Sequence, residues 1–392
     1  MIGNLRIFII AGEASGDILG ANLMRALRET HPEVKFHGVG GRKMIAEGLN
    51  SLFPMEELSV MGIAEVLPRL FHILYRIRQT AHEIEKAQPH AVITIDSPDF
   101  CFRVIKKLKS RLTNIPCIHY VAPSVWAWRP GRAETVSKFL DHILTLLPFE
   151  PPYFIKYGLQ ATFVGHPVVE RLENRGEGDR FRKKHKLKQD QPVLCMLPGS
   201  RMSELSRLLD KFSETADIVL RNKHNAVIVI PTLPHLKSYI DKFFVGKGIN
   251  PILVYDEEEK FDAFAASQIA IAASGTVSLE LAMTDTPHII AYKLSPVSAL
   301  LAKHLIHTPY VNLINILLNR RVVPELLLEQ CEPGPMSKEL LRLMGNKEAR
   351  AAQLMDFREA LIKIGLGDPE TPSHRAAKAV LEVIEQRGSK SP

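Results

Sequence analysis

One loop in the second half of the chain combines glycine, hydroxyl groups and a nearby acid in a pattern that suits phosphate binding. The stretch AASGTVSLELA, residues 272–282, places Ser274, Gly275 and Thr276 between an apolar run and a helical pattern. Free backbone N–H groups at a helix start carry partial positive charge, and Gly275 lets a ligand approach the backbone closely. We predict that a diphosphate binds at this loop and that Glu280 accepts the hydroxyls of a ribose. A helix that is simply capped by Ser274 and Thr276 is the alternative.

A second loop in the same half carries an arginine at the end of another apolar run. The stretch LPGSRMSEL, residues 197–205, contains Gly199, which permits a tight turn, followed by Ser200 and Arg201. A guanidinium binds phosphate through two parallel N–H donors, so we assign these residues to the same nucleotide site. A surface arginine paired with Glu204 is the alternative. Neither loop matches the glycine motifs of dinucleotide-binding or P-loop proteins, which argues against a nicotinamide or flavin cofactor and against an ATPase.

The loop near the start of the chain, IAGEASGDILG at residues 10–20, contains glycines but also two carboxylates, which repel phosphate. We therefore assign it to the sugar side of a site, where polar side chains accept hydrogen bonds from hydroxyls and the glycines allow close approach. The residues concerned are Gly12, Glu13, Ser15, Gly16 and Asp17. The alternative for Asp17 is capping of a helix that starts near Ile18.

An aspartate stands directly after an apolar run in VITIDSPDF, residues 92–100. At the end of a strand, Asp96 is a candidate general base if burial brings its pKa toward the working pH. An ordinary turn residue is the alternative, and Asp99 is expected to cap the next helix or to lie in the turn.

Both tryptophans of the chain lie in HYVAPSVWAWRPGR, residues 119–132. Trp126 and Trp128 are two positions apart, so they do not share a helix face. We expect one of them to pack in the core, while the other can stack on a sugar or an acyl chain.

The segment GIAEVLPRLFHILYRIRQTAHEIEK, residues 62–86, carries more apolar side chains than one buried helix face requires. Arginines stand among these extra side chains, which is typical of a helix that lies in a membrane interface and is attracted to anionic lipid. The interface of a homodimer is the alternative. The residues predicted to face the membrane are Val66, Leu67, Leu70, Phe71 and Leu74.

Composition limits the class of protein. The chain has 392 residues, of which 46% are hydrophobic and 24% charged, as expected for a globular protein with two domains. Its net charge of +7 suits anionic lipid or a phosphorylated substrate, and no recognised nucleic-acid motif occurs. The four cysteines show no Cys-x-x-Cys pair, so we expect a reducing cytosol, without a disulfide framework or zinc site. We also expect neither a secretory signal nor a transmembrane helix.

Short apolar runs alternate with helical patterns in both halves, which predicts an α/β protein with two doubly wound, Rossmann-like domains. Ligands bind such sheets at the carboxyl ends of the strands, so the active site is expected in a cleft between the domains. The predicted divisions are an N-terminal acceptor-side domain 1–173, a linker 174–191, a nucleotide-sugar domain 192–365, and a C-terminal helix 366–392 that packs back on the N-terminal domain.

The segments AGEASGD, DSPDF, VAPSVWAWRPGR, VGHP, LPGSR and SGTVSLEL follow one another between residues 11 and 281. Together they resemble the lipid-A-disaccharide synthases, glycosyltransferases of the two-domain GT-B type, over almost the whole chain. The resemblance implies transfer of a sugar from UDP-2,3-diacylglucosamine to 2,3-diacylglucosamine 1-phosphate, with no metal or other cofactor. It also implies a peripheral protein on the cytoplasmic face of the inner membrane, with Asn315 in the UDP-binding half.

This reaction inverts the anomeric centre, because an α-linked donor gives a β-linked product, and one in-line attack then needs one base. Asp96 is the candidate, while His166 of VGHP is expected to orient neighbouring backbone. With no metal, helix starts and Arg201 have to stabilise the leaving diphosphate. The alternatives are a transferase with a lipid-linked muramyl acceptor, a UDP-sugar 2-epimerase, and a non-catalytic protein that binds nucleotide sugars.

Overall fold

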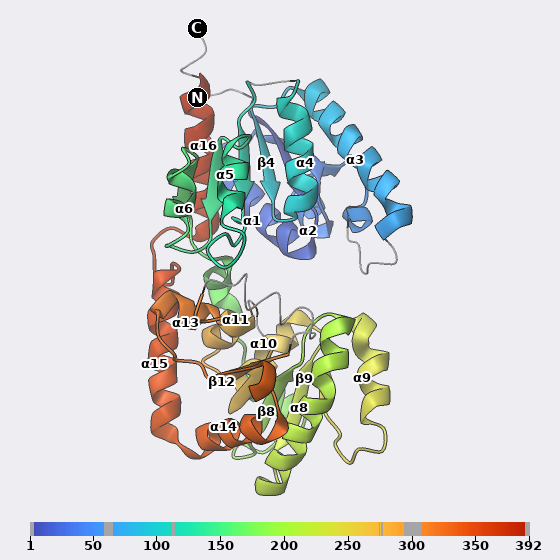
Figure 1. The fold of residues 1–392 in the computed structure, drawn as a ribbon, viewed down its shortest axis with the longest axis vertical. Helices are drawn as coiled ribbons and strands as arrows, with labels where there is room; N and C mark the ends of the chain where they lie inside the picture. The colour runs from blue at the N-terminus through green and yellow to red at the C-terminus, as the bar shows by residue number, and fades with distance from the viewer. Residues whose placement is uncertain are drawn as a thin grey trace. The chain divides into compact units, whose positions relative to one another are not determined.

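A computed structural model describes residues 4–58, 66–111, 114–273, 275, 277–293 and 308–388. The chain divides into two compact units (Figure 1). The first unit comprises Met1–Pro167 together with Gly367–Pro392, and the second comprises Val168–Leu366. Each unit is built on one parallel sheet, so the predicted α/β fold with two doubly wound sheets is confirmed.

The first unit contains a seven-stranded parallel sheet in the order β3-β2-β1-β4-β5-β6-β7. The strands are β1 (Arg6–Ala11), β2 (Lys35–Val39), β3 (Asn50–Ser51), β4 (Ala91–Ile95), β5 (Cys117–Tyr120), β6 (His142–Thr145) and β7 (Gln160–Phe163). The helices are α1 (Ala14–Thr30), α2 (Arg42–Ala46), α3 (Val66–Ala87), α4 (Pro98–Lys109), α5 (Gly131–Ser137), α6 (Pro151–Ile155) and α16 (Pro372–Gly388), with a 3-10 turn at Met55–Leu58.

Helices cover both faces of this sheet, which explains why its strands read as continuous apolar runs. In β1, Ile7 and Ile9 face the core formed with α1 and α16. Phe8 and Ile10 face the opposite core, formed with α3 and α4. Figure 1 shows the same division, with α16 on one side of the sheet and α3 and α4 on the other.

The second unit contains a six-stranded parallel sheet in the order β10-β9-β8-β11-β12-β13. The strands are β8 (Val193–Leu197), β9 (Val227–Pro231), β10 (Ile252–Val254), β11 (Ile269–Ala272), β12 (His288–Tyr292) and β13 (Glu325–Leu327). The helices are α7 (Gly178–Lys184), α8 (Met202–Asn222), α9 (Lys237–Phe244), α10 (Glu257–Ala266), α11 (Val277–Met283), α13 (Leu313–Leu318), α14 (Pro333–Gly345) and α15 (Lys347–Lys363). The 3-10 turns are Pro167–Asn174, Pro234–Leu236 and Leu328–Gln330.

The prediction of a linker at 174–191 is wrong, because this segment folds into the second unit. Helix α7 lies within it and packs on α10. Its one large apolar side chain, Phe181, is 1% exposed and contacts a small core formed with Val193 and Val229. The polar composition that suggested a linker belongs to the remaining faces of a short helix with a single buried residue.

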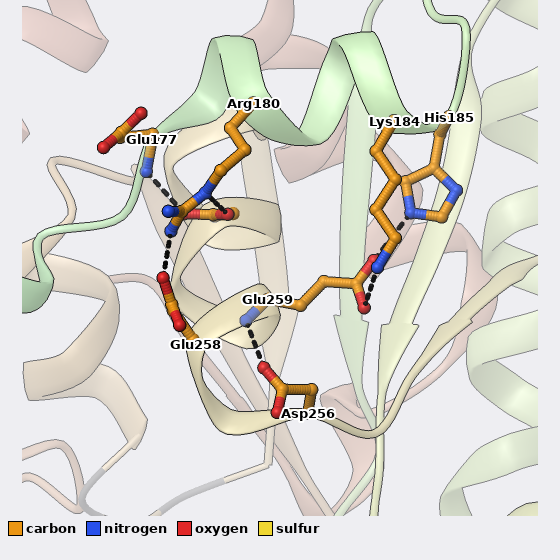
Figure 2. A network of polar contacts seen from close by, with 8 residues as sticks. Glu177, Arg180, Lys184, His185, Asp256, Glu258 and Glu259 are labelled. Carbon is orange, nitrogen blue, oxygen red and sulfur yellow. Dashed lines mark hydrogen bonds and ion pairs between the residues drawn. The ribbon is translucent and has the colours of Figure 1, made fainter.

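Ion pairs fix α7 to α10 (Figure 2). Arg180 binds Asp262 through Nε at 2.5 Å and Nη2 at 2.9 Å, and it also binds Glu258 at 2.8 Å. At the other end of α7, Lys184 and His185 each contact Glu259 at 2.8 Å. Charged residues that resemble a solvated linker in the sequence thus make specific contacts in the fold.

The C-terminal helix α16 belongs to the first unit. Ala376, Ala377 and Val380 are buried in the core shared with α1. The Arg375 guanidinium donates a hydrogen bond to the Val164 carbonyl at 2.8 Å. The end of the chain therefore completes the layer on the α1 face of the first sheet.

Candidate active site

The same topological feature occurs in both sheets. The first strand of each unit lies in the middle of its sheet, so β1 pairs with β4 and β8 pairs with β11. On either side of that pair the chain winds in opposite directions, and ligands bind open α/β sheets at such a switch point. The loops after these four strands carry most of the predicted site residues, and Asn315 lies elsewhere, in α13.

Register brings the paired loops together. In the first unit Ala11 pairs with Ile95, so Gly12 and Asp96 leave the sheet side by side. In the second unit Leu197 pairs with Ala272, and the Ala273 N–H donates to the Leu197 carbonyl at 2.9 Å. Each unit therefore presents two of the predicted loops next to each other at the carboxyl edge of its sheet.

Asp96 and Ser97 both adopt left-handed backbone conformations, with φ of 52° and 42°. Such conformations cost roughly 1–2 kcal/mol for each non-glycine residue, so the surrounding structure has to enforce them. The Asp96 carboxylate is fixed by hydrogen bonds from the Ser15 hydroxyl at 3.2 Å and from the Ser97 N–H at 2.9 Å. Strain of this kind concentrates at functional sites, and here it orients the carboxylate of the candidate base.

The two glycines of the first loop have a packing role. A Cβ on Gly12 would lie 2.5 Å from the Ser97 Oγ. A Cβ on Gly16 would lie 3.3 Å from the Ile95 carbonyl oxygen. Both glycines therefore allow the loop after β1 to approach the end of β4, which brings Ser15 within reach of Asp96.

Asp17 does not face a sugar, and this prediction is corrected. It is 5% exposed, and its carboxylate accepts hydrogen bonds from the backbone N–H groups of Gly41, Lys43 and Met44 at 2.8–3.0 Å. Helix α1 begins at Ala14, so Asp17 lies inside that helix and caps α2 instead. Glu13 and Ser15 remain exposed at the carboxyl edge of the sheet.

The second sheet presents an arginine beside a capped helix start. The Glu204 carboxylate accepts hydrogen bonds from the backbone N–H groups of Ser200 at 3.0 Å and Arg201 at 3.2 Å. Gly199, at φ 115°, is required because its Cβ would lie 2.5 Å from the Glu204 Oε2. The Arg201 side chain is 74% exposed, with one guanidinium nitrogen 3.5 Å from Glu204. The alternative of a pairing with Glu204 is thus present, and the guanidinium still reaches solvent.

The loop between β11 and α11 contains Gly275, which is exposed and has φ of 146°. Ser274 and Thr276 lie outside the described residues. Glu280, in the first turn of α11, forms an ion pair with Lys260 at 3.0 Å. A ribose at this position would meet this ion pair rather than an isolated carboxylate.

Asn315, which the resemblance assigns to the UDP-binding half, contacts protein groups of the second unit. It is fully buried, and its amide nitrogen donates to the Val323 carbonyl and to Glu325. Its amide oxygen accepts the N–H groups of Val322 and Val323 at 2.8 Å. All four hydrogen-bonding positions of the amide are occupied, so Asn315 fixes the turn between α13 and β13.

Helix α3 buries one apolar face and exposes two aromatic side chains near its start. Ile77, Ala81 and Ile84 are buried, as the helical spacing predicts, whereas Phe71 is 80% and Tyr75 57% exposed. Leu74, predicted to face the membrane, is half-buried and packs on the core. The side chains of Val66, Leu67 and Leu70 and residues 62–65 lie outside the described part of the chain. Of the predicted residues whose side chains the structure describes, Phe71 is exposed and Leu74 is half-buried.

One acidic residue of the first unit was missed by the sequence analysis. Glu150 is 4% exposed, and its carboxylate accepts hydrogen bonds from the Trp126 indole at 3.1 Å and from the Leu146 and Leu147 N–H groups. Burial raises the pKa of Glu150 to about 7. The signal in the sequence is an acid inside the apolar stretch LLPFEPP, directly after a strand. His166 is also buried.

The described residues contain neither a candidate membrane-spanning helix nor a candidate metal cluster. None of the helices in this part of the chain combines the length and apolar character needed to cross a membrane. No group of three or more His, Cys, Asp or Glu side chains in the same part is arranged to hold a metal ion. All four cysteines are buried and free.

Known proteins resemble this chain over nearly its whole length. A family model described as lipid-A-disaccharide synthetase matches residues 7–377. The lipid-A-disaccharide synthase of Rhodospirillum centenum is 49% identical over 384 residues, which cover 98% of this chain and 96% of that protein. The synthase of Paramagnetospirillum magneticum is 48% identical over 383 residues, which cover 97% of this chain and 98% of that protein.

Solved structures with low sequence identity share the fold. MnaA of S. aureus, solved with UDP, has a TM-score of 0.66 at 11% identity and 99% coverage of both chains. A glycosyltransferase from Rickettsia africae has a TM-score of 0.60 at 11% identity, with full coverage of both chains. Two doubly wound units, each built on one parallel sheet, and the likeness to these solved structures place the chain in the GT-B fold class. Within it, the chain belongs to the lipid-A-disaccharide synthase family, and it is a glycosyltransferase of lipid A biosynthesis.

Proposed function

We propose that the chain transfers the sugar of UDP-2,3-diacylglucosamine to the 6-hydroxyl of 2,3-diacylglucosamine 1-phosphate. The products are a β(1→6)-linked disaccharide 1-phosphate and UDP. Membership of the synthase family supports this reaction. The observation that carries the residue assignments is the pairing of the predicted loops at the switch point of each sheet.

The second unit is proposed to bind the UDP part of the donor. Arg201 donates hydrogen bonds to the diphosphate, because its guanidinium is exposed beside the switch point of this sheet. Gly275 lets the diphosphate approach the backbone, and Glu280 accepts the ribose hydroxyls in its ion pair with Lys260. The remaining residues proposed to bind the UDP-sugar are Gly199, Ser200, Ser274 and Thr276. The backbone N–H group of Ser200 already donates a hydrogen bond to Glu204.

The first unit is proposed to bind the acceptor and to supply the base. The Asp96 carboxylate takes the proton of the 6-hydroxyl while that oxygen attacks the anomeric carbon and the bond to UDP breaks. Attack from the face opposite the leaving group inverts the anomeric centre. Glu13 and Ser15 lie on the same loop edge and are proposed to bind sugar hydroxyls, while Gly12 and Gly16 set the shape of the loop.

Helix α3 is proposed to bind the anionic cytoplasmic surface of the inner membrane, where both acylated substrates reside. Phe71 and Tyr75 are exposed aromatic side chains on this helix, and Arg78 is an exposed cation on it. Arg76, by contrast, is 16% exposed and is paired with Glu57 at 2.7 Å. Exposed aromatic residues flanked by cations are typical of a peripheral membrane helix. The alternative is that this surface forms a homodimer interface. Measuring partition onto anionic vesicles together with the oligomeric state distinguishes the two.

The reaction is tested with the purified full chain, UDP-2,3-diacylglucosamine and the monosaccharide 1-phosphate in mixed micelles. We expect UDP release in equal amount to a new disaccharide 1-phosphate, measured by mass spectrometry. A parallel sample without acceptor tests for a 2-epimerase, which would change the donor sugar without any acceptor. Release of UDP without a disaccharide, or change of the donor alone, would contradict the proposed reaction.

A further inference from the structure

An exposed tryptophan and arginine lie one after the other in the loop between β5 and α5. Trp128 is 40% exposed, and the guanidinium carbon of Arg129 lies 4.5 Å from the centre of the Trp128 ring. A guanidinium stacked on an aromatic face keeps its N–H donors directed outward in the plane of the group. The pair therefore presents an apolar ring face and a set of hydrogen-bond donors to solvent.

The backbone at this pair is strained. Arg129 has φ of 52°, which is uncommon for a residue with a side chain. The next residue is Pro130, and a residue before proline already has a restricted backbone. Val121, where the same loop begins, has φ of 79°, although it is β-branched. Conformations of this kind persist where the surroundings enforce them, and they concentrate at ligand sites.

The surroundings that hold the loop are visible on its inner side. Trp126 donates its indole N–H to the buried carboxylate of Glu150 and packs edge-on against Phe149 at 5.3 Å between ring centres. Val125 is 2% exposed and belongs to the core of the first unit. Trp126 thus has a structural role, whereas Trp128 and Arg129 are exposed on the part of the loop that Trp126 and Val125 hold in place.

The loop adjoins the candidate base. Strand β5 pairs with β4, and the Asp96 N–H donates to the Tyr120 carbonyl at 3.0 Å, so Val121 leaves the sheet next to Asp96. Arg132, at the start of α5, lies 3.8 Å from Asp99 in the first turn of α4, the helix that follows β4. Arg132 thus has a carboxylate partner, whereas no ion pair joins Arg129 to a carboxylate within the described ranges.

We propose that Trp128 and Arg129 form the subsite for the phosphate-bearing end of the acceptor sugar. The Arg129 guanidinium binds the 1-phosphate through paired N–H donors, and the Trp128 ring packs on the apolar face of the glucosamine ring. The 1-phosphate on C1 and the 6-hydroxymethyl group on C5 are attached to the two carbons that flank the ring oxygen, so a phosphate held on this loop keeps the 6-hydroxyl near the neighbouring loop with Asp96. The inference rests on the proposed function, since it concerns the acceptor of that reaction.

Binding without turnover is the first test. The chain has two tryptophans, so fluorescence reports on few sites. We expect unacylated glucosamine 1-phosphate to change the fluorescence of the native chain and not that of Trp128→Phe, in which Trp126 remains as a reference. Arg129→Ala should weaken this binding by about tenfold or more, with Arg129→Lys intermediate. Glucosamine without phosphate should bind the native chain more weakly than its 1-phosphate.

Turnover provides the second test. Arg129→Ala should raise the acceptor KM by about tenfold or more and leave the donor KM unchanged. Arg111→Ala is the matched control, because Arg111 is 50% exposed in the same unit and is paired with Glu85. Thermal unfolding should show the same midpoint for the Arg129 and Arg111 variants, because substitutions at exposed positions change stability little.

Each outcome separates this inference from the proposed function. An unchanged acceptor KM in Arg129→Ala overturns the subsite, even if the native chain makes the disaccharide. Binding of glucosamine 1-phosphate at Trp128 by a chain that forms no disaccharide overturns the reaction and leaves the subsite intact. If Arg129→Ala instead loses binding to phosphatidylglycerol vesicles and keeps glucosamine 1-phosphate binding, the pair contacts the lipid surface and the inference is wrong.

Discussion

The carboxyl edges of the two sheets have the same topology but different chemistry. In the first unit, a carboxylate is held by strained backbone and by a serine from the adjacent loop. In the second unit, the corresponding loops carry glycines at positive φ and an exposed arginine. The switch point of the first sheet therefore carries an oriented carboxylate, Asp96, that can accept a hydrogen bond or a proton. The switch point of the second sheet carries an exposed cation, Arg201, beside loops that contain glycine.

The difference shows how one fold supports two tasks. Proton transfer needs a group in a single orientation, and the hydrogen bonds from Ser15 and Ser97 provide it for Asp96. Binding a diphosphate needs positive charge and close approach to the backbone, which Arg201 and Gly275 are proposed to provide. Among the described residues of the four switch-point loops, non-glycine residues at positive φ occur in the first unit, where orientation matters most.

Replacing Asp96 by Asn is expected to have the largest effect on this comparison. The substitution removes the proton acceptor while keeping the size of the side chain, so kcat should fall by about 10²–10⁴-fold. The measurement is initial-rate kinetics with both substrates saturating. Asp217→Asn, at an exposed ion pair on α8, is the control and should retain native kcat. A native kcat in Asp96→Asn would contradict the proposal that the carboxyl edge of the first sheet supplies the base.

Replacing Glu150 by Gln tests how this buried carboxylate, which holds Trp126, contributes to the stability of the first unit. The quantity followed is the pH dependence of the free energy of unfolding. Burial raises the pKa of Glu150 to about 7, from 4.5 in the absence of the fold. Between these values the folded state binds a proton that the unfolded state lacks, so the free energy of unfolding decreases as pH rises. The contribution is fully present below about pH 4.5 and is lost as pH rises through 7.

The measurement is denaturant unfolding of the native chain and Glu150→Gln at pH 5 and pH 8. The native chain should lose about 2–3 kcal/mol more than the variant over this interval, since one pKa unit corresponds to about 1.4 kcal/mol. Parallel pH profiles for the two proteins would show that Glu150 does not titrate in this range. All other titrating groups are common to both proteins, so the difference isolates Glu150.

Replacing Gly12 or Gly275 by Ala should have different effects at the carboxyl edges of the two sheets. Gly12→Ala places a Cβ against Ser97 and should destabilise the first unit by about 1–3 kcal/mol and lower kcat through Asp96. Gly275→Ala meets no neighbouring atom but strains a backbone at φ 146°, so it should mainly weaken UDP binding. Thermal unfolding and UDP titration of both variants are the measurements. Equal loss of UDP binding in the two variants would contradict the division.

Substitution of the exposed α3 residues should have the smallest effect on chemistry. Phe71→Ser with Tyr75→Ser removes exposed aromatic surface and should reduce partition onto anionic vesicles several-fold, with native kcat in mixed micelles. Ile155→Ser, at another exposed apolar residue of the first unit, is the control. Unchanged partition together with a change in oligomeric state would assign this surface to a homodimer.

The sequence predicted the architecture well because parallel strands buried on both faces read as continuous apolar runs. β1, β4, β8 and β11 were each recognised in this way, and the loops after them follow from topology. The linker prediction failed because α7 contributes a single buried side chain, Phe181, and its ion pairs with α10 come from residues distant in the sequence.

Individual side chains were less predictable than the loops that carry them. Asp17 and Asn315 looked like ligand residues, yet each is satisfied by backbone groups that only the folded chain brings near. The strain at Asp96 and the burial of Glu150 likewise depend on neighbouring strands. Local patterns therefore identify where a site lies, while contacts across the sheet decide which residues remain available to a ligand.

The division of tasks between the two units is tested most directly by calorimetric titration of UDP into Asp96→Asn and Arg201→Ala. The account predicts native affinity for Asp96→Asn and at least about tenfold weaker binding for Arg201→Ala, because only the second removes a charged partner of the diphosphate. Weakened binding in Asp96→Asn with native binding in Arg201→Ala would contradict it.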